Sequence, residues 1–337
     1  MMFIHSNLIN VCKLKNGLRR YMLDRFFSEQ QMEPALFEIF LPQWGSKTLA
    51  LILHLATGQR LFVRLYRPWQ RPEAEKNKAI TQLLMDNGVS VPRLLGYADM
   101  PKRYYSIISV EEYVESTPVV PEHYTPELAA RLATQLAKLH SIRAPRWGQP
   151  PEPSGRSGFG SYIIRHVLNR VSRIQQHRVL GAIPNRKELI AQLRQWKNEL
   201  NLIPQYNLTH DKIPGRNVIL SPDGRLFFID FPTAYYSFFA KDLVSFHHRF
   251  CSDDEEKIEV FNAAYFASML PEDKTRFERL HPFYDAWFHL SRCAENANAA
   301  QKCFRAGEGY GREYQKKSQE HWETASCILK EHPPRQG

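Results

Sequence analysis

The chain has 337 residues, of which 43% are hydrophobic and 24% are charged, and its formal net charge is +10. This composition is typical of a soluble globular protein, and the length suffices for two lobes that each bury a core. Because there is no run of 18 apolar residues and no apolar core near the N-terminus, we expect neither a membrane span nor a secretory signal. The five scattered cysteines fit reduced thiols and a cytoplasmic location.

Strand-like patterns dominate the first part of the chain. Residues 1–34 mix apolar and basic positions, and predict an extension with a short helix near residues 23–27 whose role the sequence does not show. The pattern then predicts, in order, a strand at residues 37–40, a turn at residues 44–47, and a hairpin made of Leu49–Leu55 and residues 61–66.

A helix is predicted after these strands, with Pro72 in its first turn, where a missing N–H costs little. Its buried face is defined by three apolar residues: Ile80, Leu83 and Leu84. At 100° per residue, Glu73 lies within about 30° of the centre of that face, whereas Glu75 points nearly opposite. Glu73 is therefore the preferred inward-facing acid, although the helix dipole alone also favours an acid in the first turn.

The rest of the chain is predicted to be mainly helical. Residues 104–110 predict a last strand, and Thr125 followed by a proline and an acid predicts the N-cap of a helix. His140, at the end of that helix, is interpreted as a structural histidine rather than a ligand. Helices are expected over residues 162–202, and again from Asp242 to about Glu331.

Residues 208–243 contain the acids and the amide that we expect to carry chemistry. Asn217 opens a short apolar run, a Ser-Pro-Asp-Gly turn follows at residues 221–224, and a second apolar run ends at Asp230. Two short runs around a tight turn predict a β-hairpin that would hold Asn217 and Asp230 near one another. Their amide and carboxylate oxygens suit Mg²⁺. Asp211, just before them, would orient a hydroxyl for attack on a phosphate carried by that metal.

This segment resembles the catalytic segment of the aminoglycoside phosphotransferase and choline kinase-like family of the protein-kinase-like superfamily. That family reads roughly H-G-D-x-x-P-x-N, then a hairpin, I-D-F and, about a dozen residues on, D-L. The chain has the matching positions in order: Asp211, Pro214, Asn217, Ile229-Asp230-Phe231 and Asp242-Leu243. Residues 88–97, 111–116 and 136–140 are also similar to the family's V-P-V-P-R-V-L-G-Y, E-Y-V-E-G and L-A-x-L-H segments.

The resemblance implies an α+β, two-lobed protein-kinase-like fold and an ATP- and Mg²⁺-dependent phosphotransferase acting on a hydroxyl of a small molecule or sugar. An antiparallel-sheet N-lobe with one αC-type helix would span residues 35–116. A mainly helical C-lobe with the catalytic loop and metal site would span residues 117–337, and residues 1–34 would be an N-terminal extension.

The resemblance also implies a role for each candidate site residue. Asp211 would be catalytic, Asn217 and Asp230 would bind the metal, and Asp242 would support the catalytic loop. Arg64 occupies the third-strand position of a phosphate-contacting lysine; Glu73 is its expected partner, with Glu75 as the alternative. Backbone groups of Glu112 and Val114 would hydrogen-bond the adenine of ATP.

One spacing departs from the family pattern. Asn217 is the sixth residue after Asp211, whereas the family places its Asn at the fifth residue after the catalytic Asp. An alignment without a gap would place Lys212 in the catalytic position and suggest an inactive protein. An insertion at residues 215–216 keeps Asp211 three residues before Pro214, and we prefer it because it satisfies two fixed positions.

Two other functions remain open at this point. A lipopolysaccharide-core or glycolipid sugar kinase would suit the charge of +10, and would allow peripheral contact with a membrane. An inactive pseudokinase, acting as a binding or regulatory protein, is favoured by the spacing, by Arg64 in place of lysine and by the single glycine at residues 44–47. No nucleic-acid partner is expected, because no recognition module is present. The sequence sets neither the acceptor nor the oligomeric state.

Overall fold

The computed structural model describes residues 34–40, 48–55, 57–99, 106–156, 158–177, 180, 185–213 and 215–334. The short helix expected near residues 23–27 and the turn expected at residues 44–47 lie outside this part. The described residues divide into two compact units. The first unit runs to Asp86 and adds Ser90–Thr117 and Ser221–Pro232; the second consists of Asn87–Val89, Pro118–Leu220 and the residues from Thr233 onward. Among the described helices, none has the length and apolar character needed to cross a membrane.

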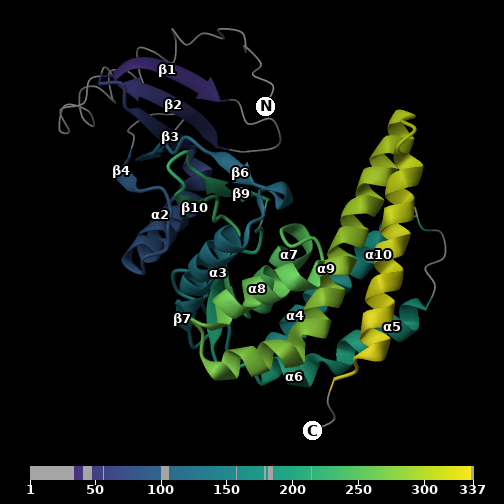
Figure 1. The fold of residues 1–337 in the computed structure, drawn as a ribbon. Coiled ribbons are helices and arrows are strands. Elements are labelled where there is room, and N and C mark those ends of the chain that lie inside the picture. Colours follow the sequence, from purple (N-terminus) through teal and green to yellow (C-terminus); the bar gives the residue numbers. More distant parts are fainter. Residues whose placement is uncertain are drawn as a thin grey trace. The chain divides into compact units, whose positions relative to one another are not determined.

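The first unit is built on an antiparallel sheet with the strand order β1-β2-β3-β5-β4 (Figure 1). The strands are β1 (Pro34–Phe40), β2 (Leu49–Leu55), β3 (Arg60–Tyr66), β4 (Leu94–Asp99) and β5 (Ile107–Glu112). The alternation of residue types in β3 explains its central position, because Leu61, Val63 and Leu65 are fully buried and Arg64 is half-buried on the other face. The predicted β2–β3 hairpin is confirmed.

One long helix accompanies this sheet. After the short 3₁₀ helix η2 (Pro68–Gln70), α2 spans Arg71–Asp86 and packs against β4 and β5. Ile80 and Leu84 are fully buried, as the helical periodicity predicts, while Leu83 is half-buried. Ala74 of α2 meets Tyr66 and Ile107 in a small buried core between helix and sheet. The first unit therefore combines an antiparallel sheet with one helix.

The turn predicted at residues 221–224 is present between β9 (Gly215–Leu220) and β10 (Leu226–Phe228). The N–H of Gly224 donates to the carbonyl of Ser221 at 2.9 Å, and the N–H of Ser221 donates to the carbonyl of Arg225 at 2.9 Å. Gly224 has φ of 81°, which glycine adopts without a steric penalty. The turn sequence therefore ends one strand and starts the next, as its residue types indicate.

The second unit is mainly helical. Its helices are η3 (Pro121–His123), α3 (Pro126–Ser141), α4 (Phe159–Gln176), α5 (Arg186–Gln195), α6 (Lys197–Asn201), α7 (Ala240–Arg249), α8 (Glu255–Phe266), α9 (Pro271–Ala306) and α10 (Gly311–Glu331). The predicted N-cap of α3 is confirmed, since the hydroxyl of Thr125 accepts the N–H of Leu128 at 3.1 Å. The helical stretch expected over residues 162–202 is divided into α4, α5 and α6.

A small antiparallel sheet in this unit has the strand order β11-β8-β7. It consists of β7 (Arg143–Ala144), β8 (Tyr206–Thr209) and β11 (Tyr235–Ser237), while β6 (Thr117–Val119) lies earlier in the chain. All four residues of the middle strand β8 are buried. The buried strand β8 therefore leads directly into the loop that begins at His210.

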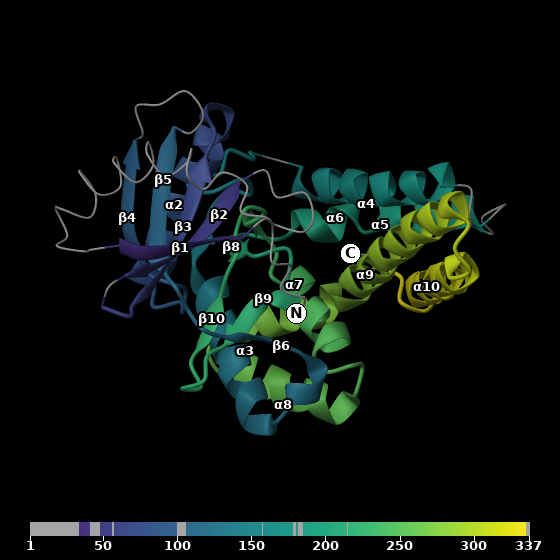
Figure 2. The ribbon, with the colours of Figure 1, turned by 90° about the horizontal axis from the view of Figure 1, so that it is seen from above.

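Two long helices dominate the C-terminal part of the second unit. α9 and α10 lie side by side in both views (Figures 1 and 2), and α7 packs against α9. Large apolar side chains fill the contacts of these helices, including Phe246 on α7, Leu280 and Tyr284 on α9, and Trp322 on α10, each at most 1% exposed. Burial of such side chains is worth about 2–3 kcal/mol each, so this packing fixes α7 relative to α9.

Candidate active site

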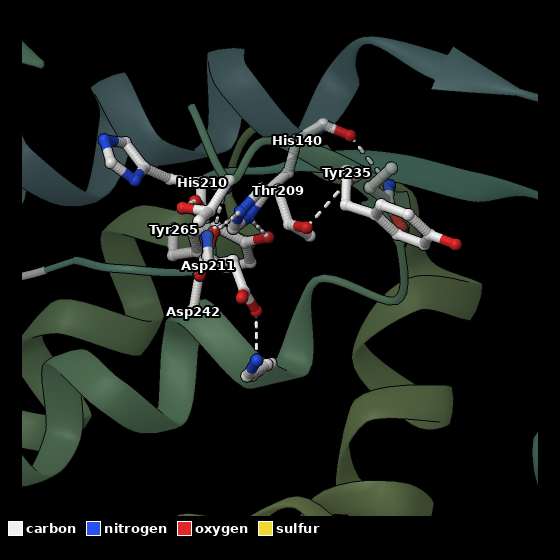
Figure 3. Close-up of polar contacts among 10 residues, drawn as sticks. His140, Thr209, His210, Asp211, Tyr235, Asp242 and Tyr265 are labelled. Atoms are coloured by element: carbon white, nitrogen blue, oxygen red, sulfur yellow. Dashed lines mark hydrogen bonds and ion pairs between the residues drawn. The ribbon is translucent and has the colours of Figure 1, made fainter. Parts of the chain in front are cut away.

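The first turn of α7 contributes a buried carboxylate that holds the loop after β8 (Figure 3). Asp242 is 1% exposed, and its oxygens accept the backbone N–H of His210 at 2.7 Å and that of Asp211 at 3.0 Å. Two peptide donors on one carboxylate fix the direction of the chain at these residues. Asp211 has φ of 72°, a conformation that costs free energy for a residue with a side chain and that its surroundings must hold. Asp242 therefore positions Asp211.

His140, from the end of α3, completes the surroundings of Asp242. Its Nε2 lies 3.3 Å from Oδ2 of Asp242, and its Nδ1 lies 2.7 Å from the hydroxyl oxygen of Tyr265. Because the ring is fully buried and both nitrogens have partners, the predicted structural role of His140 is confirmed. Burial raises the pKa of Asp242, but the hydrogen bonds from His140 and from the His210 N–H outweigh it and leave that pKa below its ordinary value.

Two hydroxyl groups hold the same loop from the side of β11. The Thr209 hydroxyl donates to the carbonyl of Tyr235 at 2.7 Å, and the Thr233 hydroxyl donates to the carbonyl of His210 at 3.1 Å. These bonds satisfy backbone carbonyls that a sharp loop would otherwise leave without partners. The loop is thus held by side chains on both of its edges before any ligand binds.

The Asp211 carboxylate forms an ion pair with Lys241, the residue before Asp242. The Asp211 side chain is 32% exposed, so the carboxylate is held but accessible. The Lys241 Nζ also lies 4.6 Å from the centre of the Trp287 ring, a cation–π contact that limits where the ammonium can move. Sequence reasoning missed Lys241; its position directly before the Asp-Leu dipeptide is the signal that could have indicated it.

Asn217 lies on β9 and is tied back to the same loop. Its Nδ2 donates to the carbonyl of Lys212 at 3.0 Å, which leaves the amide oxygen Oδ1 as an acceptor or ligand atom. The Lys212 side chain is exposed. The structure therefore ties Asn217, on β9, to the loop that carries Asp211 through the backbone carbonyl of Lys212.

A row of rings continues from Lys241 away from the loop. We call Trp147, Tyr162, His166, Tyr235 and Trp287 the aromatic series. His166 packs edge-on against Trp287 with centroids 5.6 Å apart, and Tyr162 stacks on Tyr235 at 5.9 Å and on Trp147 at 4.5 Å. Burial and then the charge of Lys241 lower the pKa of His166. Apart from Trp287, which is buried, the members are half-buried.

Arg64, in the first unit, pairs with a different acid from the one expected. Its Nε lies 3.3 Å from Oε1 of Glu111, and no ion pair between Arg64 and Glu73 occurs in the described part of the chain. The register explains this, because Arg64 faces Ser109 on β5, and Glu111 lies two residues further along on the same face. Burial lowers the pKa of Arg64, but Glu111 and more weakly Asp230 raise it to a net value above the ordinary one.

Glu73 and Glu75 have other surroundings. Glu73 lies in the first turn of α2, where its charge adds weakly to the burial that raises the pKa of Tyr66 and opposes the burial that lowers the pKa of Lys76. Glu75 forms an ion pair with Arg71 at 3.5 Å, one turn away on the surface of the helix. Neither acid of α2 therefore takes the place of Glu111 beside Arg64.

Asp230 follows β10 and is exposed, with φ of 65°. Lys76 of α2 donates to the carbonyl of Pro232 at 3.0 Å, which fixes the chain two residues after Asp230. Asp211 and Asp230 are thus two of the few described non-glycine residues with positive φ. Such strain gathers at sites where geometry is used in function.

The expected adenine-binding residues lie at and after the end of β5. The N–H of Glu112 already donates to the carbonyl of Arg93 at 2.8 Å, so its carbonyl is the remaining backbone group. The carbonyl of Val114 accepts the Ser116 hydroxyl at 3.2 Å, which leaves the Val114 N–H as the donor at that residue. The backbone groups that remain at these two residues are therefore one acceptor and one donor.

Comparison with known proteins decides the family. A family model described as "Phosphotransferase enzyme family" matches residues 45–280. The chain belongs to this family. It is a kinase-like phosphotransferase, and its fold is the protein-kinase-like α+β fold expected from the sequence. A search of curated proteins found no match.

Several solved structures share the fold of this phosphotransferase at low sequence identity. One from Ralstonia eutropha, provisionally described as an aminoglycoside phosphotransferase, is 14% identical with a TM-score of 0.64, covering 94% of this chain and 98% of its own. The choline kinase LicA from Streptococcus pneumoniae is 16% identical with a TM-score of 0.54, covering 91% and 99%. Spectinomycin phosphotransferase in complex with ADP and spectinomycin is 13% identical with a TM-score of 0.56, covering 90% and 98%.

Proposed function

We infer that this phosphotransferase moves the γ-phosphoryl group of ATP to a hydroxyl of a small molecule or sugar, with Mg²⁺ as the metal. The observation that carries the proposal is the hold of buried Asp242 on the backbone of Asp211. A half-exposed carboxylate in a strained, rigidly supported loop is suited to orienting a reacting group. The family match supports the reaction class.

In the proposed reaction, Asp211 accepts the proton of the acceptor hydroxyl. The acceptor oxygen forms a bond to the γ-phosphorus, the bond from that phosphorus to the bridging oxygen breaks, and ADP leaves with the electron pair. Lys241 contacts Oδ1 of Asp211, so Oδ2 is the oxygen that we assign to the acceptor. Positioning of this kind supplies much of the rate in phosphoryl transfer, since the protein does little covalent chemistry itself.

Arg64 is proposed to contact the phosphates of ATP, with Glu111 as the acid that orients its guanidinium. A guanidinium offers a planar fork of donors that matches phosphate oxygens. Its Nε is buried and makes no hydrogen bond with the residues that the structure describes, although Glu111 lies 3.3 Å away. Glu73, the partner expected from the sequence, is left with an electrostatic role beside Lys76.

Asn217 and Asp230 are proposed to supply oxygen ligands to Mg²⁺. The Asn217 amide nitrogen is engaged by the Lys212 carbonyl, so its oxygen is the free end, and Asp230 offers an exposed carboxylate. This donor set fits a hard cation. When bound, the metal would neutralise phosphate charge. The proposal rests on the order and spacing of the two residues in the chain, on the available amide oxygen of Asn217 and on the exposed carboxylate of Asp230. Glu112 and Val114 are proposed to bind adenine through their remaining backbone groups.

The aromatic series supports an acceptor with an apolar or ring-shaped face. Its members lead in contact from Trp287, beside Lys241, to Trp147. Aromatic walls with few polar groups are typical of sites for small molecules. A sugar of a glycolipid would also fit this description, and the net charge of +10 would favour its anionic headgroup.

The test compares Asp211→Asn with Lys212→Ala in full-length protein. ATP consumption is measured with Mg²⁺ against amino alcohols, aminoglycosides, glycated amines, free sugars and glycolipid-containing membrane extracts. We expect Asp211→Asn to lower kcat by about 10²–10⁴-fold, while Lys212→Ala changes it by less than roughly threefold, because the contribution of Lys212 to the loop is its carbonyl.

The opposite ranking would support the alignment that places Lys212 in the catalytic position. If no acceptor increases ATP consumption, Mg²⁺-ATP binding distinguishes the remaining cases. A ligand at 100 times its Kd adds about 2.7 kcal/mol to the free energy of unfolding, a shift that Asp230→Ala should abolish. Absence of any shift at millimolar ATP would overturn the proposal and leave the pseudokinase.

A further inference from the structure

A second cluster of ionisable side chains lies at the opposite end of α7 from Lys241 and Asp242. His248, in the last turn of α7, meets Asp285 and His289 of α9, while Asp253 follows α7 in the chain. His248 lies seven residues after Lys241, which is about 10 Å along a helix. None of these groups takes part in the proposed phosphoryl transfer.

Three ligand atoms of this cluster converge on one point. Nε2 of His248 lies 2.6 Å from Oδ1 of Asp285, and Nε2 of His289 lies 3.8 Å from the same oxygen. All three atoms lie within 4.8 Å of one another. In a tetrahedral Zn²⁺ site with bonds of about 2.0–2.1 Å, ligand atoms are about 3.3 Å apart. Small side-chain adjustments would therefore bring all three into coordination.

The other ring nitrogen of each histidine has its own partner. Nδ1 of His248 lies 2.5 Å from a carboxylate oxygen of Asp253, and Nδ1 of His289 lies 2.8 Å from Nδ1 of His321 on α10. A metal-binding histidine usually donates its remote N–H to a carboxylate or another acceptor, which fixes the tautomer and the ring direction. This arrangement leaves both Nε2 atoms facing Asp285, where a metal would be.

Packing holds these rings in place while leaving the site reachable. His248 stacks on Phe288 with centroids 4.0 Å apart and an interplanar angle of 7°. The side chains of His248, Asp285 and His289 are 13%, 19% and 13% exposed, so an ion and a water molecule can enter. Asp253 and Asp285 together balance a dication. The nearby cations are Arg249, which lies over the Phe288 ring, and Arg292, whose guanidinium pairs with Glu295.

We propose that His248, Asp285 and His289 bind a divalent transition-metal ion, best matched by Zn²⁺, with water in the fourth position. Two imidazoles and one carboxylate are ligands that Zn²⁺ prefers and Mg²⁺ does not. Bound metal would tie the end of α7 to α9, and would thereby stabilise the helix whose first turn holds the Asp211 loop. The site is independent of the proposed ATP and acceptor chemistry.

The test measures Zn²⁺ and Co²⁺ binding by full-length protein after treatment with a chelator. Titration calorimetry should show one equivalent of Zn²⁺ and release of protons, since binding requires deprotonated imidazoles. Co²⁺ should give the visible absorption of a four-coordinate site, and a large excess of Mg²⁺ should not displace it. The melting temperature should rise with Zn²⁺ alone, in the absence of ATP and acceptor.

Matched variants separate this site from adventitious binding. His248→Gln, Asp285→Asn and His289→Gln keep side-chain size and should each lower affinity by at least about 100-fold, whereas His321→Ala and Asp253→Asn should lower it by roughly 10–100-fold. His281→Ala, one turn before Asp285 on α9, is the control and should bind Zn²⁺ as the unaltered protein does. Circular dichroism confirms that each variant is folded.

Two outcomes would overturn the proposal. Zn²⁺ affinity that persists in all three ligand variants would show that thiols or other groups hold the ion. Absence of binding at micromolar Zn²⁺ in the folded protein would show instead that the cluster is an ion-pair network, in which protonated His248 donates one N–H to Asp253 and the other to Asp285. Both outcomes are independent of whether an acceptor is ever found.

Discussion

At each end of α7 a histidine contacts an aspartate. The surroundings of the two aspartates differ, and the comparison shows two different roles of a carboxylate. At the first turn, both oxygens of Asp242 accept hydrogen bonds from peptide N–H groups, and the residue is 1% exposed. At the last turn, the carboxylate of the half-buried Asp285 contacts the imidazole rings of His248 and His289. A carboxylate saturated by backbone donors fixes a chain, whereas one that faces only titratable side chains can exchange a proton for a metal ion.

The largest effect should follow from removing the first of these carboxylates. Asp242→Ala leaves two peptide N–H groups and His140 without their acceptor in a buried site, and should cost about 3–5 kcal/mol in the free energy of unfolding. Phosphotransferase activity should disappear, because the Asp211 loop loses its support. Urea unfolding and kinetic assays measure the two effects.

A control variant tests whether the large loss of stability comes from the burial of Asp242 and not from the removal of an acidic side chain as such. Asp254 caps α8 by accepting the N–H of Lys257 at 3.1 Å near the surface. Asp254→Ala should cost only about 1 kcal/mol. If Asp242→Ala does not fold, Asp242→Asn retains one acceptor oxygen and should lie between the two. Equal costs for Asp242→Ala and Asp254→Ala would contradict the comparison.

The next largest effect should be the contribution of Asp242 to the free energy of unfolding at acid pH. Its pKa is lower in the folded protein than the ordinary value of 3.8, despite burial, because of the bonds from His140 and His210. Its contribution is therefore fully present above about pH 4 and is lost as the pH falls through the lower folded-state pKa. Urea unfolding between pH 2 and pH 6 should show a steeper acid loss in the unaltered protein than in Asp242→Asn. Parallel curves would disprove this assignment.

Glu111 resembles Asp285 in facing a basic side chain, so its loss should affect function more than folding. Glu111→Gln should raise the KM for ATP roughly fivefold, the effect of about 1 kcal/mol of lost ion pairing, with little change in stability. Glu73→Gln should change that KM less. Steady-state kinetics with varied ATP distinguishes the two, and a larger effect from Glu73 would restore the pairing expected from the sequence.

The smallest effect concerns the thiol of Cys251, which lies two residues after the end of α7. Burial raises the pKa of Cys251 to about 12, so its thiolate is rare at neutral pH, whereas Cys327 is exposed. A chromogenic disulfide reagent should modify Cys327 first and Cys251 only as this end of α7 opens. If Zn²⁺ ties α7 to α9, it should slow the Cys251 reaction further, and Cys251→Ser assigns the phase. A fast Cys251 reaction would show that this end of α7 is loosely held.

Local patterns were enough to predict much of the fold. The β2–β3 hairpin, α2, the Thr125 N-cap and the turn at residues 221–224 each depend on residues close in sequence, so their types and periods report them directly. The end of the last helix at Glu331 also agrees with the expectation. The divisions between α4, α5 and α6 were not predicted, because amphipathic spacing continues across short breaks.

The sequence by itself determined the class of protein, because the residues that carry the family resemblance, among them Asp211, Asn217, Asp230 and Asp242, lie within one short stretch of chain. Only the tertiary structure decided which groups meet. The β3–β5 register places Glu111 beside Arg64, and the packing of α7, α9 and α10 brings His248, Asp285 and His289 into contact. Periodicity tells which face of an element is buried, but it carries no information about the distant side chain that this face meets. Long-range pairing is fixed by the packing of whole elements.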